Sequence, residues 1–553
     1  MSPVTPPELH GFLPWKALLS LVAIGTLTTA TSIRNGFTQD DLPLILANKT
    51  VHSLESPWRF VVEPYWNDPF PPALYRPLAT ATHAVQWAVG DGSPRAFRLT
   101  SVALLFGAGL ALFGFASLLL PRALAWSAAA LFLAHPVHVE ATALAVNQGE
   151  LAVGTLLCLA IALYIRARRR GALGTGTIGA VSACYLAASL FKENGLILPG
   201  LLLVAELTVI TDPRSWRERY MDLRPAYLFL VLVGVLVVAA RTAVLGGDTI
   251  GTPRAEVLAG SGPAGRMVTM LGVIPHWLRL LFWPAELQAD YGPDEIAEGV
   301  HWGFLQWLGL ALLVGWATMV GYWRRRRPVL AFALLWIGVA ILPVSNVIVP
   351  TGVILAERTL FLASAGAALF IGGLMSAVSA SRSSPRESWR LQAALAVVAL
   401  LVGLGVWRSW VRNPVWRDQE ALLRHTAADA PRSYAAHLAL ARFLSDSGAA
   451  AEADPHFREA AAIEPTLVIR ERAVGDRFRL AGYCRPALRR YRLPLLVRPE
   501  DSGVRAAVVE CLLQVGRFEE ARLMALPGLQ DPAASAFFRR AVDSADSALV
   551  GSR

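Results

Sequence analysis

The sequence predicts an all-helical polytopic membrane protein that continues into an α-solenoid of soluble helices. Long apolar runs separated by short arginine-rich blocks fill residues 1–412. Hydrophobic residues make up 54% of the chain and charged residues only 17%, a balance typical of membrane-spanning proteins. From residue 413 the composition changes to Ala, Leu, Arg and Glu, and a repeat begins. We therefore expect a membrane domain over 1–412 and a repeat domain over 413–553.

Runs of about 20 apolar residues are long enough to cross a bilayer. The sequence predicts eleven such spans, at 12–31, 99–120, 123–146, 150–165, 174–190, 195–211, 226–240, 302–323, 329–349, 357–380 and 391–410. The first span is interpreted as a retained anchor, with a cleaved signal peptide as the alternative. A further segment, 268–285, carries Pro275, His276 and Arg279 in its middle. We expect it to form a re-entrant or interfacial hairpin buried against protein.

Arginine supplies almost all of the basic charge behind the net charge of +10, because the chain has only three lysines. The arginines gather in blocks at 166–170, 214–219, 324–327 and 382–390, which the positive-inside rule assigns to the cytoplasm. This pattern indicates membrane topology rather than a nucleic-acid partner. It predicts a cytoplasmic N-terminus, a first extracytoplasmic loop over 32–97 and an extracytoplasmic repeat domain.

The C-terminal part repeats with a period of 34 residues. The positions that keep this step include Pro431, Pro465 and Pro499, and Gly448, Gly482 and Gly516. Such a period, with Gly in a turn and Pro at the end of each unit, is typical of tetratricopeptide repeats. Cys484 and Cys511 are expected at adjacent helix ends, either as a disulfide or as two packed thiols.

Asp40 and Asp41 are the first acidic residues after the first predicted span. A carboxylate held where a membrane helix emerges into water is suited to act as a general base. The alternative is that one of them caps a short interfacial helix, since Asp is a favoured N-cap residue.

Three ionisable residues surround a proline in the third predicted span, namely His135, His138 and Glu140. Pro136 should break the helix there, and ionisable groups inside a span are functional candidates by default. The alternative is a structural kink in which backbone carbonyls satisfy the two histidines.

Three basic residues are candidates for binding a phosphate. Lys192 lies in a predicted external turn beside Glu193 and is a compact cation, or else a snorkelling anchor at a helix end. Arg76 lies in the aromatic-rich first loop, where it could instead contact lipid phosphates. Arg358 follows a predicted external turn, and its alternative is a structural pair with Glu357.

Together these motifs resemble the transmembrane-and-tetratricopeptide family of protein O-mannosyltransferases and their bacterial relatives. The matching stretches are Asp40-Asp41, Tyr75-Arg-Pro77, His135-Pro-Val-His-Val-Glu140, Lys192-Glu193, Leu342-Pro-Val-Ser-Asn346 and Ala356-Glu-Arg358. The resemblance covers almost the whole chain. It implies a GT-C type membrane glycosyltransferase in a bacterial cytoplasmic membrane. It also implies a sugar, mannose, carried on a polyprenyl phosphate.

Transfer of a sugar from a lipid phosphate to a hydroxyl needs a base for the acceptor proton and cations for the departing phosphate. We expect Asp41 to be the base, with Asp40 as its orienting partner or as the base itself. The phosphate-binding candidates are Arg76, His135, His138, Lys192 and Arg358, and the supporting carboxylates are Glu140, Glu150, Glu193 and Glu357. A single displacement would invert the anomeric centre, and neither a metal nor another cofactor is expected.

The repeats offer a concave surface that could hold a protein or glycan acceptor. Two other functions fit parts of the pattern. A non-enzymatic membrane scaffold would use the repeats to gather partners, with the polar residues serving structure. A transporter would also contain proline-broken spans and intramembrane charges, but here those charges gather near one membrane surface rather than at the midplane.

Overall fold

The computed structural model describes residues 14–66, 72–171, 173–246, 255, 258, 261–292, 296, 302–379 and 385–551. Within these residues every regular element is a helix, apart from an isolated bridge between Trp66 and Ala73. The chain divides into two compact units. We call 1–291 with 296–422 the membrane unit, and the helices from Leu423 onward the repeat unit.

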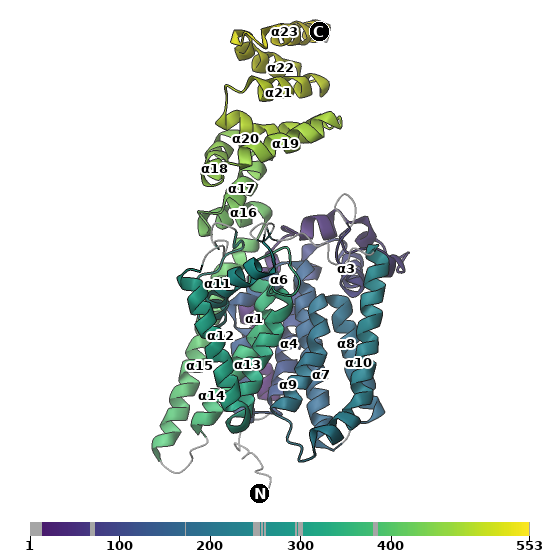
Figure 1. Cartoon of the computed structure of the whole chain (residues 1–553), viewed down its shortest axis with the longest axis vertical. Coiled ribbons are helices and arrows are strands. Elements are labelled where there is room, and N and C mark those ends of the chain that lie inside the picture. The colour runs from purple at the N-terminus through teal and green to yellow at the C-terminus, as the bar shows by residue number, and fades with distance from the viewer. Residues whose placement is uncertain are drawn as a thin grey trace. The chain divides into compact units, whose positions relative to one another are not determined.

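Eleven helices of the membrane unit correspond to the eleven predicted spans (Figure 1). They are α1 (Pro14–Thr29), α4 (Pro94–Ala116), α5 (Arg122–Leu133), α7 (Gln148–Arg169), α8 (Thr175–Phe191), α9 (Leu198–Leu207), α10 (Trp216–Leu245), α12 (Phe304–Arg326), α13 (Pro328–Ile341), α14 (Phe361–Ser379) and α15 (Pro385–Arg412). In the described part of the chain, six helical segments are long and apolar enough to cross a membrane, and four further apolar helices are shorter. The predicted fold class, a polytopic helical membrane protein, is confirmed.

The segment predicted to be a re-entrant hairpin forms instead one helix, α11 (Pro263–Phe282), with Pro275 inside it. The physical reason is its close packing against α12. A Cβ atom at Gly309 of α12 would lie 1.9 Å from the backbone oxygen of Leu271, so the two helices approach as closely as glycine permits. This backbone contact supports a continuous helix despite the N–H that proline lacks.

The helix of the third predicted span is broken near Pro136, as the sequence predicts. Helix α5 ends at Leu133 and is followed by three short elements, η4 (Pro136–His138), α6 (Val139–Ala143) and η5 (Ala145–Asn147). Nearly all side chains of this broken stretch are buried. It lies against α4, α15 and η9 (Glu357–Leu360), so its irregular backbone is enclosed by protein.

The first loop packs on this broken stretch through a hydrophobic cluster of its own. The loop contains η2 (Leu42–Leu46), η3 (Lys49–His52), α2 (Arg59–Val62) and α3 (Pro77–Gly90). Buried members of the cluster include Ile45 from the loop, Phe97 from α4 and Val146 from η5. Burial of these apolar side chains fixes the loop over the ends of the helices.

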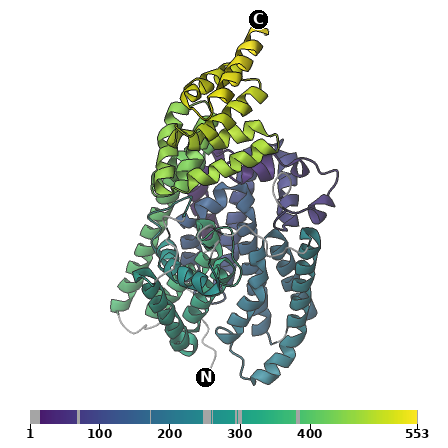
Figure 2. The ribbon, with the colours of Figure 1, turned by 45° about the horizontal axis from the view of Figure 1, so that its top comes forward.

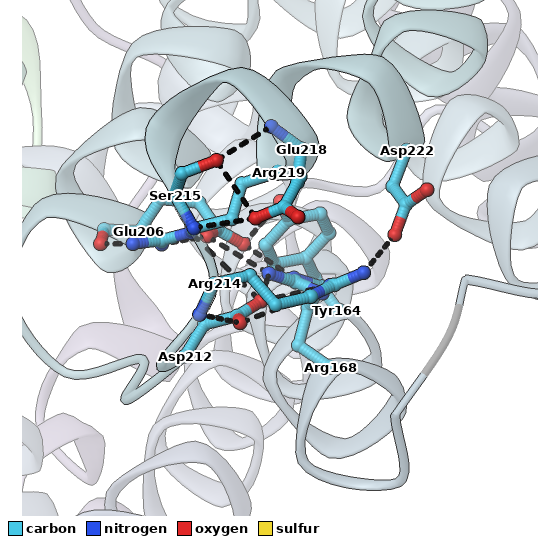
Figure 3. Close-up of polar contacts among 9 residues, drawn as sticks. All are labelled: Tyr164, Arg168, Glu206, Asp212, Arg214, Ser215, Glu218, Arg219 and Asp222. Carbon is cyan, nitrogen blue, oxygen red and sulfur yellow. Dashed lines mark hydrogen bonds and ion pairs between the residues drawn. The ribbon is translucent and has the colours of Figure 1, made fainter.

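At the opposite ends of α7, α9 and α10, buried charges tie the three helices together (Figure 3). Glu206 accepts hydrogen bonds from Tyr164 Oη at 2.8 Å and from Arg168 Nε at 2.6 Å, and also from Arg219. Arg168 Nη2 reaches Asp212 at 2.9 Å. Two predicted arginine blocks, 166–170 and 214–219, therefore meet at this end. The block predicted at 382–390 begins outside the described residues.

The repeat unit is a stack of helix pairs, seen in yellow-green in Figures 1 and 2. Its helices are α17 (Tyr434–Asp446), α18 (Ala450–Ile463), α19 (Leu467–Leu480), α20 (Cys484–Val497), α21 (Ser502–Gln514), α22 (Phe518–Ala525) and α23 (Ser535–Gly551). Gly448, Gly482 and Gly516 occupy the turns with φ of 86°, 81° and 78°. Glycine adopts this left-handed conformation without steric cost, and the predicted 34-residue helical repeat is confirmed.

The two cysteines of the repeat unit are free thiols on adjacent helices. Cys484 Sγ donates a hydrogen bond to Gln514 Oε1 at 3.0 Å, and Cys511 is also buried. This arrangement matches the second of the two predicted alternatives, two packed thiols.

Candidate active site

Asp41 is buried, and three donor groups hold its carboxylate. Its carboxylate forms an ion pair with Arg98 at 3.0 Å, and neither side chain is exposed. The amide N–H groups of Ala145 and Val146 also donate to it, at 3.2 and 3.0 Å. Burial raises the pKa of Asp41, and Arg98 and the two amides oppose that rise. Both carboxylate oxygens are thus engaged in joining the first loop, α4 and η5.

The side chain of Asp40 is more exposed than that of Asp41. It is half-buried, and within the described residues no group donates a hydrogen bond to its carboxylate. Gln39, directly before it, has a φ of 44°, a left-handed conformation that non-glycine residues rarely adopt. The Gln39 amide N–H is held by Gln419 Oε1 at 2.8 Å. This turn directs successive residues apart, so Asp41 enters the core while Asp40 remains accessible.

Arg76 is part of a shared ion pair centred on Glu193. Its Nη2 lies 2.8 Å from Glu193 Oε2, and Arg241 Nη1 lies 2.9 Å from Glu193 Oε1. Burial opposes ionisation of Glu193, but the two arginines outweigh it and hold its pKa at about 2. The Arg76 guanidinium also lies 5.3 Å from the centre of the Tyr65 ring. Glu193 therefore joins the first loop to the end of α10.

Lys192 pairs with Glu150, at the start of α7, with Nζ 2.6 Å from Oε1. The other Glu150 oxygen accepts from Asn194 Nδ2 at 3.1 Å. Burial lowers the pKa of Lys192, Glu150 opposes this, and the charges of Arg76 and Arg358 lower it further. Three cations that are far apart in the sequence are thus near neighbours.

Arg358 is held by Glu140 rather than by its neighbour Glu357. The Glu140 carboxylate accepts from the Arg358 guanidinium and, at 2.8 Å, from the Arg358 amide N–H. Asp40 and Glu150 both interact with Arg358 electrostatically. Glu357 is turned away and accepts from the amide of Gln288 at 2.7 Å and from Tyr291 Oη at 3.0 Å. The structural alternative predicted for Arg358, a pair with Glu357, does not occur.

The two histidines of the broken span have backbone or hydroxyl partners. His135 Nε2 lies 3.0 Å from the Leu281 carbonyl, and its Nδ1 accepts from the Val137 amide at 3.3 Å. His138 is buried between Phe132 and Phe361, with Nε2 2.8 Å from Ser364 Oγ. The predicted structural alternative, histidines satisfied at a kink, matches the contacts of His135.

We define the charge cluster as Arg76, Lys192, Arg241 and Arg358 with Glu140, Glu150 and Glu193, beside Asp40. Sequence reasoning missed Arg241, although an arginine directly after the predicted span 226–240, at its predicted external end, was a usable signal. Among the residues that the structure describes, no group of three or more His, Cys, Asp or Glu side chains is placed to hold a metal ion. The arrangement can bind an anion beside an accessible carboxylate.

The chain is similar to protein O-mannosyl-transferases. It is 25% identical to protein O-mannosyl-transferase TMTC1 of Homo sapiens over 503 residues, which cover 82% of this chain. It is 23% identical to TMTC4 of Mus musculus over 80% of this chain, and 29% identical to Tmtc2 of Drosophila melanogaster over 47%. These findings confirm the resemblance predicted from the sequence.

This chain spans only part of the length of the relatives that it matches. The aligned part spans 56% of human TMTC1 and 66% of mouse TMTC4. No family model matches the chain.

Proposed function

We propose that the chain is a membrane glycosyltransferase that moves a sugar, mannose, from a polyprenyl phosphate to a hydroxyl group of a protein. The observation that carries this proposal is the accessible carboxylate of Asp40 beside the clustered cations of Lys192 and Arg358. A base and an anion site side by side are what such a transfer requires. The similar proteins are named protein O-mannosyl-transferases, which supports the same reaction class.

Asp40 is our candidate for the base, in place of the sequence-based preference for Asp41. A general base must reach the proton that it removes, and Asp41 is enclosed by Arg98 and two amides. In the proposed step the acceptor hydroxyl gives its proton to the Asp40 carboxylate. Its oxygen forms a bond to the anomeric carbon while the bond from that carbon to the phosphate oxygen breaks. The polyprenyl phosphate leaves, and the configuration inverts.

Lys192, Arg358 and Arg76 are our candidates for holding the donor phosphate. Each carries more N–H donors than its carboxylate partner occupies, since an ammonium has three and a guanidinium five. The carboxylates of Glu150, Glu140 and Glu193 fix these cations in place before substrate binds. Such preorganisation stabilises the departing phosphate without further rearrangement. His135 and His138 are left out of this set because their ring contacts are directed elsewhere.

The location of the reaction follows from the same proposal. In this proposal the charge cluster and the repeat unit are both extracytoplasmic, as the positive-inside rule predicts from the arginine blocks. The membrane is then a bacterial inner membrane, as the resemblance implies. A stack of helix pairs forms a surface able to hold an extended polypeptide. The repeat unit is thus our candidate for presenting the protein acceptor.

The test supplies the purified full chain, in lipid nanodiscs, with radiolabelled mannose on a long-chain polyprenyl phosphate and with a Ser/Thr-rich peptide. We expect transfer to the peptide by the wild type, and loss of transfer in Asp40→Asn. A nucleotide-linked mannose serves as the alternative donor, and transfer from it alone would overturn the lipid-phosphate donor. Peptide capture that depends on the repeats, without turnover of either donor, would instead favour the scaffold.

A further inference from the structure

The turn that carries Asp40 is strained at the residue before it. Gln39 has a φ of 44°, in the left-handed region where a Cβ atom crowds the backbone. The Asp41 amide N–H donates to the Thr38 carbonyl at 3.0 Å, which closes the turn and makes Gln39 the second of its four residues. Glycine would adopt this conformation without cost, whereas a glutamine keeps it only where other contacts hold it.

Both flanks of the turn are anchored by groups that do not bond to its middle. On one side, the Gly36 amide N–H donates to the Arg417 carbonyl at 2.7 Å. On the other side, the Asp41 carboxylate pairs with Arg98 at 3.0 Å. These anchors fix where the segment enters and leaves the turn, but neither bonds to Gln39.

Gln419 supplies the contact at the middle of the turn. Its Oε1 accepts the Gln39 amide N–H at 2.8 Å. Among the described residues, this is the one hydrogen bond that reaches Gln39 or Asp40 from outside residues 35–46. Without this acceptor the amide gains by turning to water, and the φ of Gln39 can return to the ordinary negative range.

The start of α16 (Gln419–Asp429), which carries this side chain, is itself well fixed. The Asp418 carboxylate accepts the Ala421 amide N–H at 2.8 Å and caps the helix. Leu422, in the first turn of α16, is buried in the hydrophobic cluster of the first loop. The Gln419 side chain therefore extends from a fixed backbone, which is what a group that positions another residue requires.

We infer that Gln419 is a positioning residue for the proposed base, because it holds Gln39 in the conformation that directs the Asp40 carboxylate out of the core. The inference rests on the proposed function, since Asp40 is a base only in that reaction. If the φ of Gln39 relaxes, the turn changes shape between two fixed flanks, and the Asp40 carboxylate moves relative to Arg358. Displacement of a reacting group by about 1 Å can lower a rate by about 10²-fold.

The test uses the full chain in lipid nanodiscs, with the donor and the peptide of the transfer assay. Gln419→Met removes the acceptor oxygen and keeps the length of the side chain. We expect kcat to fall by about 10²-fold and the KM for the donor to stay unchanged, because other residues hold the phosphate. Adding Gln39→Gly to this variant should recover most of the loss, because glycine adopts the left-handed conformation unaided.

Hydrogen exchange reports on the turn without any turnover. Gln419→Met should speed exchange in the peptide that covers residues 37–44, measured by mass spectrometry, because the Gln39 amide loses its acceptor. Glu420→Met is the matched control, since it makes the same change at the next position of α16, where the side chain is exposed. It should leave both the exchange and kcat at the wild-type values.

The outcomes separate this inference from the proposed function. Exchange at the wild-type rate in Gln419→Met would overturn the inference, whether or not the chain transfers sugar. Faster exchange with an unchanged kcat would overturn it too, and so would a loss of kcat that Gln39→Gly does not recover, which would assign Gln419 to the stability of α16. Faster exchange in a chain that transfers sugar from neither donor would keep Gln419 as the group that sets the turn and would remove the proposed function alone.

Discussion

Asp41 and Arg98 form an ion pair at 3.0 Å in which neither side chain is exposed. The pair joins the first loop to α4, and two amides of η5 complete the partners of the carboxylate. A buried pair of this kind costs much when one partner is removed, because the remaining charge is left without compensation. In the described part of the chain no ion pair holds the neighbouring Asp40, so the two aspartates should differ in what their substitution does.

Asp41→Asn should destabilise the protein. The amide cannot neutralise Arg98, and breaking a buried ion pair costs about 3–5 kcal/mol. Thermal unfolding followed by tryptophan fluorescence should show a lower midpoint temperature. The double variant Asp41→Leu with Arg98→Met should recover part of the loss, because no charge then remains buried. An Asp41→Asn protein with wild-type unfolding and no turnover would return the role of base to Asp41.

Asp40→Asn should act on catalysis alone. Removal of a general base lowers the turnover number by about 10²–10⁴-fold. The unfolding midpoint should not change, because no hydrogen bond to the Asp40 carboxylate from the described residues is lost. Affinity for the polyprenyl phosphate, measured without acceptor, should also be retained. A fall in unfolding temperature that matches the fall in activity would contradict this assignment.

Binding of the donor phosphate should weaken as the pH rises. Burial lowers the pKa of Lys192, so its ammonium loses a proton at a lower pH than an ordinary lysine does. Phosphate affinity should therefore fall with increasing pH in the wild type. Lys192→Arg should keep its affinity at higher pH, since a guanidinium stays protonated. Identical pH profiles for the two proteins would show that Lys192 does not hold the phosphate.

Glu206→Gln should destabilise the far end of the membrane unit without altering the chemistry at the charge cluster. Glu206 is buried between Arg168 and Arg219 (Figure 3), and loss of its charge leaves both arginines less compensated. We expect about 3–5 kcal/mol of destabilisation, with wild-type turnover per folded molecule. Asp222→Asn is the control, because this aspartate is 55% exposed and exposed pairs contribute about 0–1 kcal/mol. Equal unfolding temperatures for both variants would contradict the prediction.

Much of the fold could be predicted from the sequence because its signals are local. Apolar runs of membrane length, the break at Pro136 and the glycines that recur every 34 residues each depend on a few neighbouring residues. The prediction of a hairpin around Pro275 was wrong because the contact that supports the helix is not local in the sequence. Helix α11 is supported by a contact with Gly309, which lies 34 positions farther along the chain than Pro275 and gave no local signal.

The candidate site was harder to predict in its details. The sequence indicated which ionisable residues matter, but not which carboxylate pairs with which cation. Arg358 pairs with Glu140 rather than Glu357, and Arg241 shares Glu193 with Arg76. Only tertiary packing distinguishes the enclosed Asp41 from the accessible Asp40, since both lie in one short stretch. Such partner choices depend on the positions of four or more segments at once.

Glu193 binds arginines from two distant segments with its two oxygens, Arg76 through one and Arg241 through the other. A movement of α10 away from α8 must therefore either carry the first loop with it or break one half of this shared contact. An opening between α8 and α10 and the ordering of the loop that holds Asp40 are then energetically linked. Under the proposed function, this linkage predicts a sequential kinetic order in which the donor binds before the acceptor.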